Sequence, residues 1–255
     1  TSTGTIIRLA KKLGYHGYED FKADFLKEVY YLDTHFKNID PNFPFVKTDN
    51  IQKIASKVTL LAQETLSDTL ALLEHDNLQK ALRIMQKANQ IHLAAISYSL
   101  LLGQIFKLDM LRIGKNVNIC NTNGEELFLP AVIKNNDCII IISYSGEIHN
   151  LCSLARTLKG RSVPIIAITS LGDNELKKYA DVVLHISTRE KLYSKIAGYS
   201  NENSIKLILD ILYSCYFNLM YDDNLARRIA ISKQAEVGRE STLEIMKEDN
   251  TQSGT

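Results

Sequence analysis

The sequence is poor in proline, in cysteine and in net charge, and each shortage excludes a class of protein. Four prolines among 255 residues, with 45% hydrophobic and 23% charged side chains, fit a chain that folds around a core and exclude wholesale disorder. The net charge of +1 excludes a polybasic nucleic-acid coat, so any nucleic-acid site must be a local patch. The length gives room for one medium α/β domain and a small extra unit.

The four cysteines, at positions 120, 138, 152 and 215, form no CxxC pair and stand among apolar neighbours. This spacing favours reduced core thiols over a disulfide or a zinc site, and we expect neither a metal nor another cofactor. No apolar run is long enough to span a membrane, and no signal-peptide pattern opens the chain. We therefore expect a cytoplasmic protein without membrane contact.

Residues 1–36 read as two helices joined by a glycine turn. Ile6, Leu9, Ala10 and Leu13 have the spacing of one buried helical stripe that ends at Gly14. The second helix is expected to bury Tyr18, Phe21, Phe25 and Leu26 or Val29. Residues 37–50 hold two prolines and little periodicity, which predicts a linker, and residues 247–255 are expected to be a disordered tail.

From residue 90 the pattern alternates between short apolar runs and amphipathic segments. Runs such as 138–142 lack polar alternation, as strands buried on both faces must. We predict an α/β fold in which a five-stranded parallel sheet of order 2-1-3-4-5 forms a doubly wound, flavodoxin-like sandwich over residues 51–246, preceded by the small all-α unit. The expected strands are 91–96, 117–120, 138–142, 164–168 and 182–186, and the expected helices are 51–74, 77–89, 99–113, 124–134, 148–159, 172–180, 201–221 and 223–246.

The first helix carries cations and no carboxylate, since the first acidic residue is Glu19. Small polar side chains at its start suit base edges, and cations along its flank suit phosphates. On charge alone, a solvated helix face explains the pattern better than a DNA-binding helix does. The candidate DNA-binding residues are Ser2, Thr3, Thr5, Arg8, Lys11 and Lys12.

Serine-rich loops follow the first and third predicted strands. Ser97 and Ser99 stand in one, and Ser143, Ser145 and Gly146 stand in the other. Because these strands are neighbours in the predicted order, their loops flank a crevice in which hydroxyl and N–H groups can bind an anion. The simpler alternative is that serine and glycine only make turns.

Several titratable side chains invite a catalytic reading, but no histidine has a partner at a suggestive spacing. His92, His149 and His185 are therefore taken as core or surface residues. Glu147 is explained by the positive end of a helix as well as by base catalysis.

Two stretches resemble the RpiR family of bacterial regulators. The segment from Ser2 to Arg8, followed by KKLGY at 11–15 and GYEDFK at 17–22, is similar to the end of that family's N-terminal helix-turn-helix domain. Residues 80–220, with SYSGE at 143–147, ITS at 168–170 and Glu190 after the fifth strand, resemble its sugar isomerase (SIS) domain. The resemblance implies that the serine loops and Glu190 hold a phosphosugar. It also implies further helices before residue 1, without which operator DNA should bind poorly.

Two departures from this pattern reduce the expected donor set. The family's first loop usually reads Gly-x-Gly-x-Ser, whereas this chain has Ala95 and Ser97 in place of both glycines. Where the family commonly has threonine after Ser-Gly-Glu, this chain has Ile148. We expect weakened phosphosugar binding.

The sequence favours a non-enzymatic, DNA-binding transcriptional regulator of sugar metabolism that responds to a phosphorylated sugar. The expected partners are operator DNA, the phosphosugar and further copies of the chain, in a homodimer or a dimer of dimers. One alternative is a phosphosugar isomerase or a related lyase. Another is a regulator whose degenerate sensor domain serves only for dimerisation, with the apolar run 216–221 in the interface.

Overall fold

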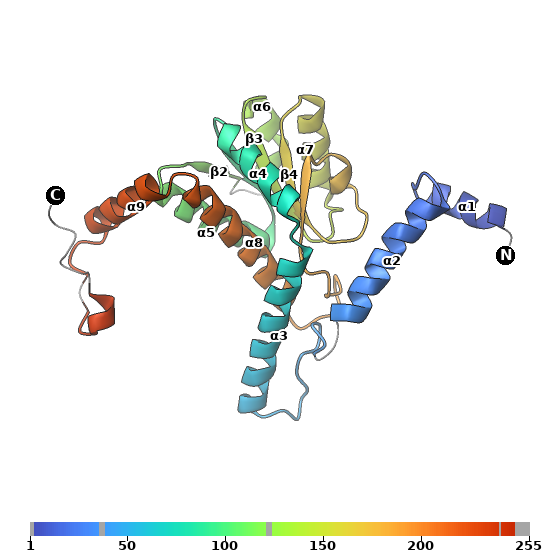
Figure 1. Ribbon diagram of the computed structural model, residues 1–255, viewed down its shortest axis with the longest axis horizontal. Helices are drawn as coiled ribbons and strands as arrows, with labels where there is room; N and C mark the ends of the chain where they lie inside the picture. Colours follow the sequence, from blue (N-terminus) through green and yellow to red (C-terminus); the bar gives the residue numbers. More distant parts are fainter. Residues whose placement is uncertain (1–2, 36–38, 121–123, 240, 248–255) are drawn as a thin grey trace.

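The computed structural model describes residues 3–35, 39–120, 124–239 and 241–247 (Figure 1). The strands are β1 (Ile91–Ala94), β2 (Val117–Ile119), β3 (Cys138–Ser143), β4 (Ile165–Thr169) and β5 (Val182–His185). The helices are α1 (Thr3–Lys12), α2 (Tyr18–His35), α3 (Ile51–Leu72), α4 (His75–Lys87), α5 (Ser97–Arg112), α6 (Leu129–Val132), α7 (His149–Gly160), α8 (Tyr199–Asn218) and α9 (Tyr221–Ala235). Short 3-10 turns are η1 (Glu125–Leu127), η2 (Leu176–Lys178) and η3 (Glu244–Met246).

The five strands form one parallel sheet in the order β2-β1-β3-β4-β5, which confirms the predicted topology. In β3, Ile140 and Ile142 pack in a core with α4, α5 and α8, whereas Ile139 and Ile141 pack in a second core with α7. All six residues of β3 are buried because helices cover both faces of the sheet. The α/β sandwich is thus explained by apolar runs without alternation.

Three expected helices are shorter than the sequence pattern predicted. Segment 124–134 begins as a 3-10 turn after the left-handed Gly124 and contains only the four-residue α6, which starts beside Pro130. Segment 172–180 holds only η2, because Leu176 donates its N–H to the carbonyl oxygen of Gly146 rather than to its own helix. Helix α9 ends at Ala235, ahead of the left-handed Gly238.

The predicted burial of the N-terminal stripe is wrong for most of its members. Ala10 is buried, but Leu9 and Leu13 are about half exposed, as are Phe25 and Leu26 of α2. Phe21 packs between the rings of Tyr15 and Phe25. The reason is geometric: α1 packs mainly on α2, and two helices cover only one narrow strip of each other.

Buried hydroxyl groups join helices α3 and α8. Thr65 and Ser200 lie 2.7 Å apart at their oxygens, and Thr69 donates to Ser204 at the same distance. Thr65 also donates to the carbonyl oxygen of Leu61, and Thr69 donates to that of Thr65. The polar atoms of both threonines therefore have hydrogen-bond partners. These small side chains fix how α3 lies against α8.

Candidate functional site

The loop after β3 is held by its own serines. Ser143 ends the strand, and its Oγ accepts a hydrogen bond from the N–H of Gly146 at 3.1 Å. Ser145 Oγ accepts from the N–H of Glu147 at 3.2 Å. Because each hydroxyl oxygen accepts a backbone N–H, each O–H proton is left to donate elsewhere. Of the two hydroxyls, that of Ser145 is half-buried at the loop ahead of α7, whereas Ser143 is only 2% exposed.

Gly146 is the residue that lets this loop close. Its φ is +67°, and a Cβ at this position would lie 2.1 Å from the side chain of Asn174. Asn174 in turn donates to Thr169 Oγ1 at 3.2 Å and accepts from the N–H of Lys177. Hence the loops after β3 and β4 are packed against each other with no room for a side chain between them.

The loop after β1 reaches the same edge of the sheet, since Ala94 pairs with Ile141 in a parallel register. Helix α5 begins at Ser97, two residues earlier than expected. Ser97 has a φ of +53°, which an L side chain rarely adopts. This is a position where the RpiR pattern has glycine, so the left-handed backbone persists although the glycine is absent. Ser97 is exposed and Ser99 is half-buried.

Glu190 does not turn its carboxylate toward the serines. Its Oε1 accepts from the N–H groups of Ser200 and Asn201 at the start of α8, and its Oε2 pairs with Lys195 at 2.8 Å. It is tied to the serine loop through its backbone instead. The hydroxyl of Tyr144 donates to the Glu190 carbonyl at 2.7 Å and accepts from the Glu190 N–H at 3.0 Å.

Sequence reasoning missed Tyr144 and Lys195. Tyr144 is flanked by the two predicted serines, and this position was the only signal available for it. Burial is the largest cause that raises the pKa of Tyr144, so it stays a neutral phenol. The Nζ of Lys195 lies 5.3 Å from the centroid of the Tyr144 ring, which places a cation beside the serine loop.

Glu147 points away from the loop's serines. Its Oε1 accepts from the N–H of Glu175 at 2.8 Å, across the gap to η2. The buried Cys152 thiol donates to the Gly146 carbonyl, and burial, followed by the charges of Glu147 and Glu175, raises the pKa of this thiol. Cys152 is therefore a structural thiol, and the Glu147 carboxylate is directed toward η2 rather than toward the serines.

The three candidate histidines lie apart from one another. His92 is buried, 3.5 Å from a carboxylate oxygen of Asp137, and burial lowers its pKa despite that neighbour. His149 is exposed at the start of α7, and His185 lies 3.2 Å from the carbonyl oxygen of Ser170. Among the described residues no three His, Cys, Asp or Glu side chains are grouped as metal ligands would be, and no helix there could cross a bilayer.

The candidate DNA-binding residues lie on α1, apart from Ser2, which is outside the described residues. Thr3 begins the helix, and Thr5 is exposed in its first turn. Arg8, Lys11 and Lys12 are exposed along it, and the helix carries no acidic residue in its first turn. In Figure 1, α1 and α2 project away from the sheet.

In comparisons with known proteins, this chain is similar in sequence to a transcriptional regulator and in fold to SIS proteins. It is 24% identical over 226 residues to an uncharacterised HTH-type transcriptional regulator of Clostridium perfringens, covering 88% of this chain and 79% of that protein. The Vibrio vulnificus NanR protein, solved in complex with ManNAc-6P, is 19% identical, with coverage of 92% of this chain and 82% of that chain and a TM-score of 0.66.

Two further structures with this fold are a domain of a regulator and an enzyme. The sugar isomerase domain of an RpiR transcription factor from Sphaerobacter thermophilus is 16% identical (71% of this chain, 99% of that chain, TM-score 0.63). Phosphoheptose isomerase from Neisseria gonorrhoeae is 14% identical (66% and 100%, TM-score 0.57). The model of the SIS domain family matches residues 84–213, about half of the chain, from α4 to α8. With the topology and the serine loop in the same segment, this match shows that the chain belongs to the SIS domain family.

Proposed function

We propose that this chain is a transcriptional regulator of the RpiR type whose SIS domain senses a phosphorylated sugar and whose N-terminal helices belong to a DNA-binding unit. The observation that carries the proposal is the combination of a two-serine loop at the start of α7 with an acid-free, cationic α1 on the same chain. The similarity to an HTH-type regulator over 88% of the chain supports it. A bound sugar phosphate would act by changing the affinity for DNA, which is an equilibrium coupling.

The sensor is proposed to bind the phosphate through Ser143 and Ser145, with Ser97, Ser99 and Glu190 around the crevice. The oxygens of the first two serines already accept backbone N–H groups, so their O–H groups can donate; Ser145 is the more accessible, because Ser143 is buried. Lys195 lies near the loop over the Tyr144 ring, with its charge paired to Glu190.

Affinity is expected to be modest. Ile148 begins α7 without a side-chain hydrogen bond, so a hydroxyl that threonine would provide is missing. Ala95 and Ser97 replace glycines that would allow closer backbone approach. Each lost hydrogen bond to a charged group costs about 1.5–3 kcal/mol, so two losses weaken binding by roughly several hundredfold.

Catalysis is not part of the proposal, because the two carboxylates nearest the serine loop are occupied. Glu147 accepts from a backbone N–H of η2, and Glu190 accepts from the start of α8 while paired with Lys195. Neither is aimed at the crevice as a general base would be. The isomerase alternative predicts turnover of a phosphosugar by the purified protein, and such turnover would replace our proposal.

Calorimetry against hexose, pentose and amino-sugar phosphates tests the sensor. Ser143→Ala combined with Ser145→Ala should weaken the best ligand about a hundredfold or more, whereas Ser67→Ala, the same change on the exposed side of α3, should have no effect. Ile148→Thr should strengthen binding. Tight binding that survives the double change would place the ligand elsewhere.

The DNA-binding role is tested by measuring operator binding of α1 variants. Arg8→Ala and Lys11→Ala should each weaken operator binding and reduce its salt dependence, because each removes a phosphate contact. Lys233→Ala on α9 removes an equally exposed charge and serves as the control. Unchanged affinity in both α1 variants would show that this helix does not contact DNA.

A homodimer completes the proposal, since two-fold operators are read by two-fold proteins. Helix α5 is apolar on both sides: it buries Phe106 and Met110 against the sheet, yet Leu101 and Leu108 are more than half exposed. A helix that is apolar all round is normally covered on all sides. Of the apolar run at 216–221, Tyr216 and Phe217 pack on the core while residues 219–221 are exposed. We propose that a second copy covers the exposed face of α5.

A further inference from the structure

A second cavity lies at the opposite edge of the sheet from the serine loops. It has a volume of about 320 Å³ and lies where strands begin: Ala88 precedes β1, Asn136 and Asp137 precede β3, and Pro164 precedes β4. All strands are parallel, so their first residues share one edge and their serine-bearing ends share the other. This cavity is therefore separate from the proposed sugar-phosphate crevice.

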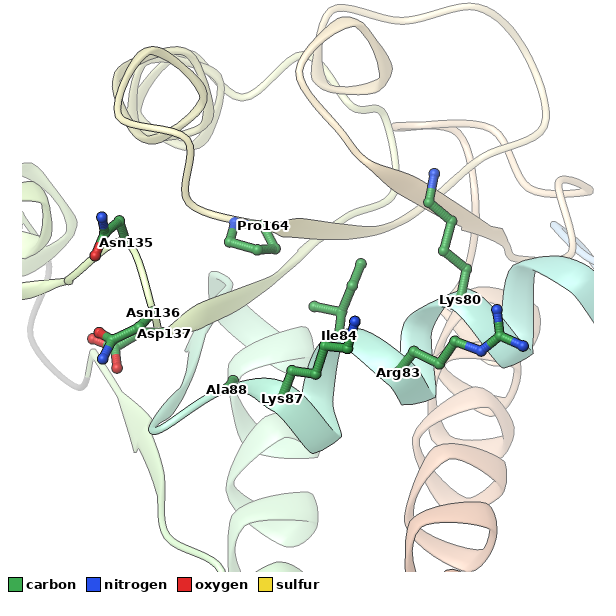
Figure 2. A pocket seen from close by; sticks show the side chains of 9 residues that line it. All are labelled: Lys80, Arg83, Ile84, Lys87, Ala88, Asn135, Asn136, Asp137 and Pro164. Carbon is green, nitrogen blue, oxygen red and sulfur yellow. The ribbon is translucent and has the colours of Figure 1, made fainter.

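Helix α4 lines one side of this cavity with cations. Lys80, Arg83 and Lys87 are spaced so that they share one face of the helix, and Figure 2 shows them along it, with Asn135, Asn136 and Pro164 across the cavity. The Nζ of Lys80 donates to the carbonyl oxygen of Asp181, which holds this side chain at one end.

The other two cations are uncompensated. Within the part of the chain that the structure describes, Arg83 and Lys87 form no ion pair and no hydrogen bond with protein groups, and both are exposed. A cationic side chain that satisfies no internal partner adds its full positive potential to the cavity it lines.

The one carboxylate in the lining does not neutralise these cations. Asp137 is 5% exposed, and its oxygens accept from the N–H groups of Gln90 at 3.2 Å and Lys134 at 2.9 Å. Its remaining close neighbour is the ring of His92, in the interior. The charge of Asp137 is thus turned inward, and the cavity keeps a net positive potential.

The rest of the lining is apolar or carboxamide. Ile84, Ala88 and Pro164 form an apolar wall, and Asn135 and Asn136 are exposed beside it, with donors and acceptors on each side chain. A ligand that suits this lining needs anionic groups for the cations, a flat apolar ring for the wall and polar ring edges for the amides. The volume is at the lower end of ordinary small-molecule sites.

From these residues we infer that the cavity between α4 and the first residues of β3 and β4 binds a nucleoside phosphate. Its phosphates lie against Arg83 and Lys87, and its base lies against Ile84 and Pro164. The inference does not depend on the proposed sugar-phosphate site or on DNA binding.

Calorimetry with ADP, adenosine and inorganic phosphate tests this. ADP should bind at least tenfold more tightly than adenosine or phosphate alone, because only ADP uses both the cations and the apolar wall. Arg83→Gln combined with Lys87→Gln should weaken ADP about tenfold or more without changing the thermal midpoint, since neither side chain holds the fold. Lys47→Gln combined with Lys233→Gln removes two exposed charges elsewhere and should leave ADP binding unchanged.

Several results would overturn the inference. Equal weakening in the two double variants, or phosphate binding as tight as ADP binding, would mean general attraction of anions. Loss of ADP binding in Ser143→Ala with Ser145→Ala would place ADP in the other crevice. Absence of ADP binding at millimolar concentration would also refute it. So would a result in which the Arg83→Gln and Lys87→Gln changes weaken the binding of a DNA fragment but not the binding of ADP.

Discussion

Replacing Gly146 by alanine should unfold the serine loop at a cost that can be worked out from its surroundings. The residue is left-handed at φ +67°, where an L side chain costs about 1–2 kcal/mol. The new Cβ would also meet the Asn174 side chain at 2.1 Å, so Asn174 must leave. Asn174 then loses its bonds to Thr169 Oγ1 and to the Lys177 N–H, each worth about 0.5–1.5 kcal/mol. We expect Gly146→Ala to lower the free energy of unfolding by about 2–5 kcal/mol.

Urea unfolding followed by circular dichroism measures this change, and Gly172→Ala is the matched control. Gly172 stands in the neighbouring loop, has an ordinary φ and has open space where its Cβ would be. Alanine there should leave stability unchanged or raise it by about 0.4–1 kcal/mol. A loss below about 1 kcal/mol for Gly146→Ala, or an equal loss for Gly172→Ala, would show that close packing of the two loops does not require glycine.

Three further changes test the packing around the site. Arg189→Met leaves Glu64 without the ion pair seen at 2.9 Å and should cost about 3 kcal/mol in urea unfolding, most of which Glu64→Leu in the same chain should recover. Burial lowers the pKa of His92 below its ordinary 6.5, more than the nearby Asp137 raises it, so the stability that neutral His92 provides is complete above about pH 6.5 and lost below it. The wild type should therefore lose stability more steeply than His92→Gln between about pH 7.5 and 5.5, and parallel curves would refute this. Leu108→Glu on the exposed face of α5 should convert the proposed dimer to a folded monomer by light scattering, whereas a persistent dimer would exclude this face.

The sheet could be predicted because each strand is specified locally. Runs such as Cys138–Ile142 are apolar without alternation, and that pattern fits only a strand buried on both faces. The short helices could not be predicted in the same way. Segment 172–180 has helical composition, but the bond from Leu176 to the distant Gly146 carbonyl competes with helix formation, and such a long-range bond leaves no trace in the local sequence.

The candidate-site residues also differ in whether the local sequence or a long-range contact determines their position. Ser143 and Ser145 could be proposed from the sequence because they follow a predicted strand directly, and the structure brings them to one edge with the loop that holds Ser97. Nothing local linked Tyr144 to Glu190, 46 residues later in the chain, or indicated that the Glu190 carboxylate would face α8. The cationic cavity on α4 was missed for the same reason, since its walls come from three separate segments.

The loop of residues 187–198 has a mechanical consequence for the proposed coupling between sugar phosphate and DNA. On one side the hydroxyl of Tyr144 is hydrogen-bonded to the backbone of Glu190. On the other side, Asn42 accepts the N–H of Lys191 with its side chain at 2.7 Å and the N–H of Ile196 with its carbonyl oxygen at 2.9 Å. The 187–198 loop thus contacts both the serine loop and the segment that leads back to α2. A ligand that displaces Tyr144 would push on that segment directly, with no need for the sheet to deform. Because such coupling is reciprocal, DNA binding that shifts residues 39–42 would change the ligand affinity of the serine loop by the same coupling free energy.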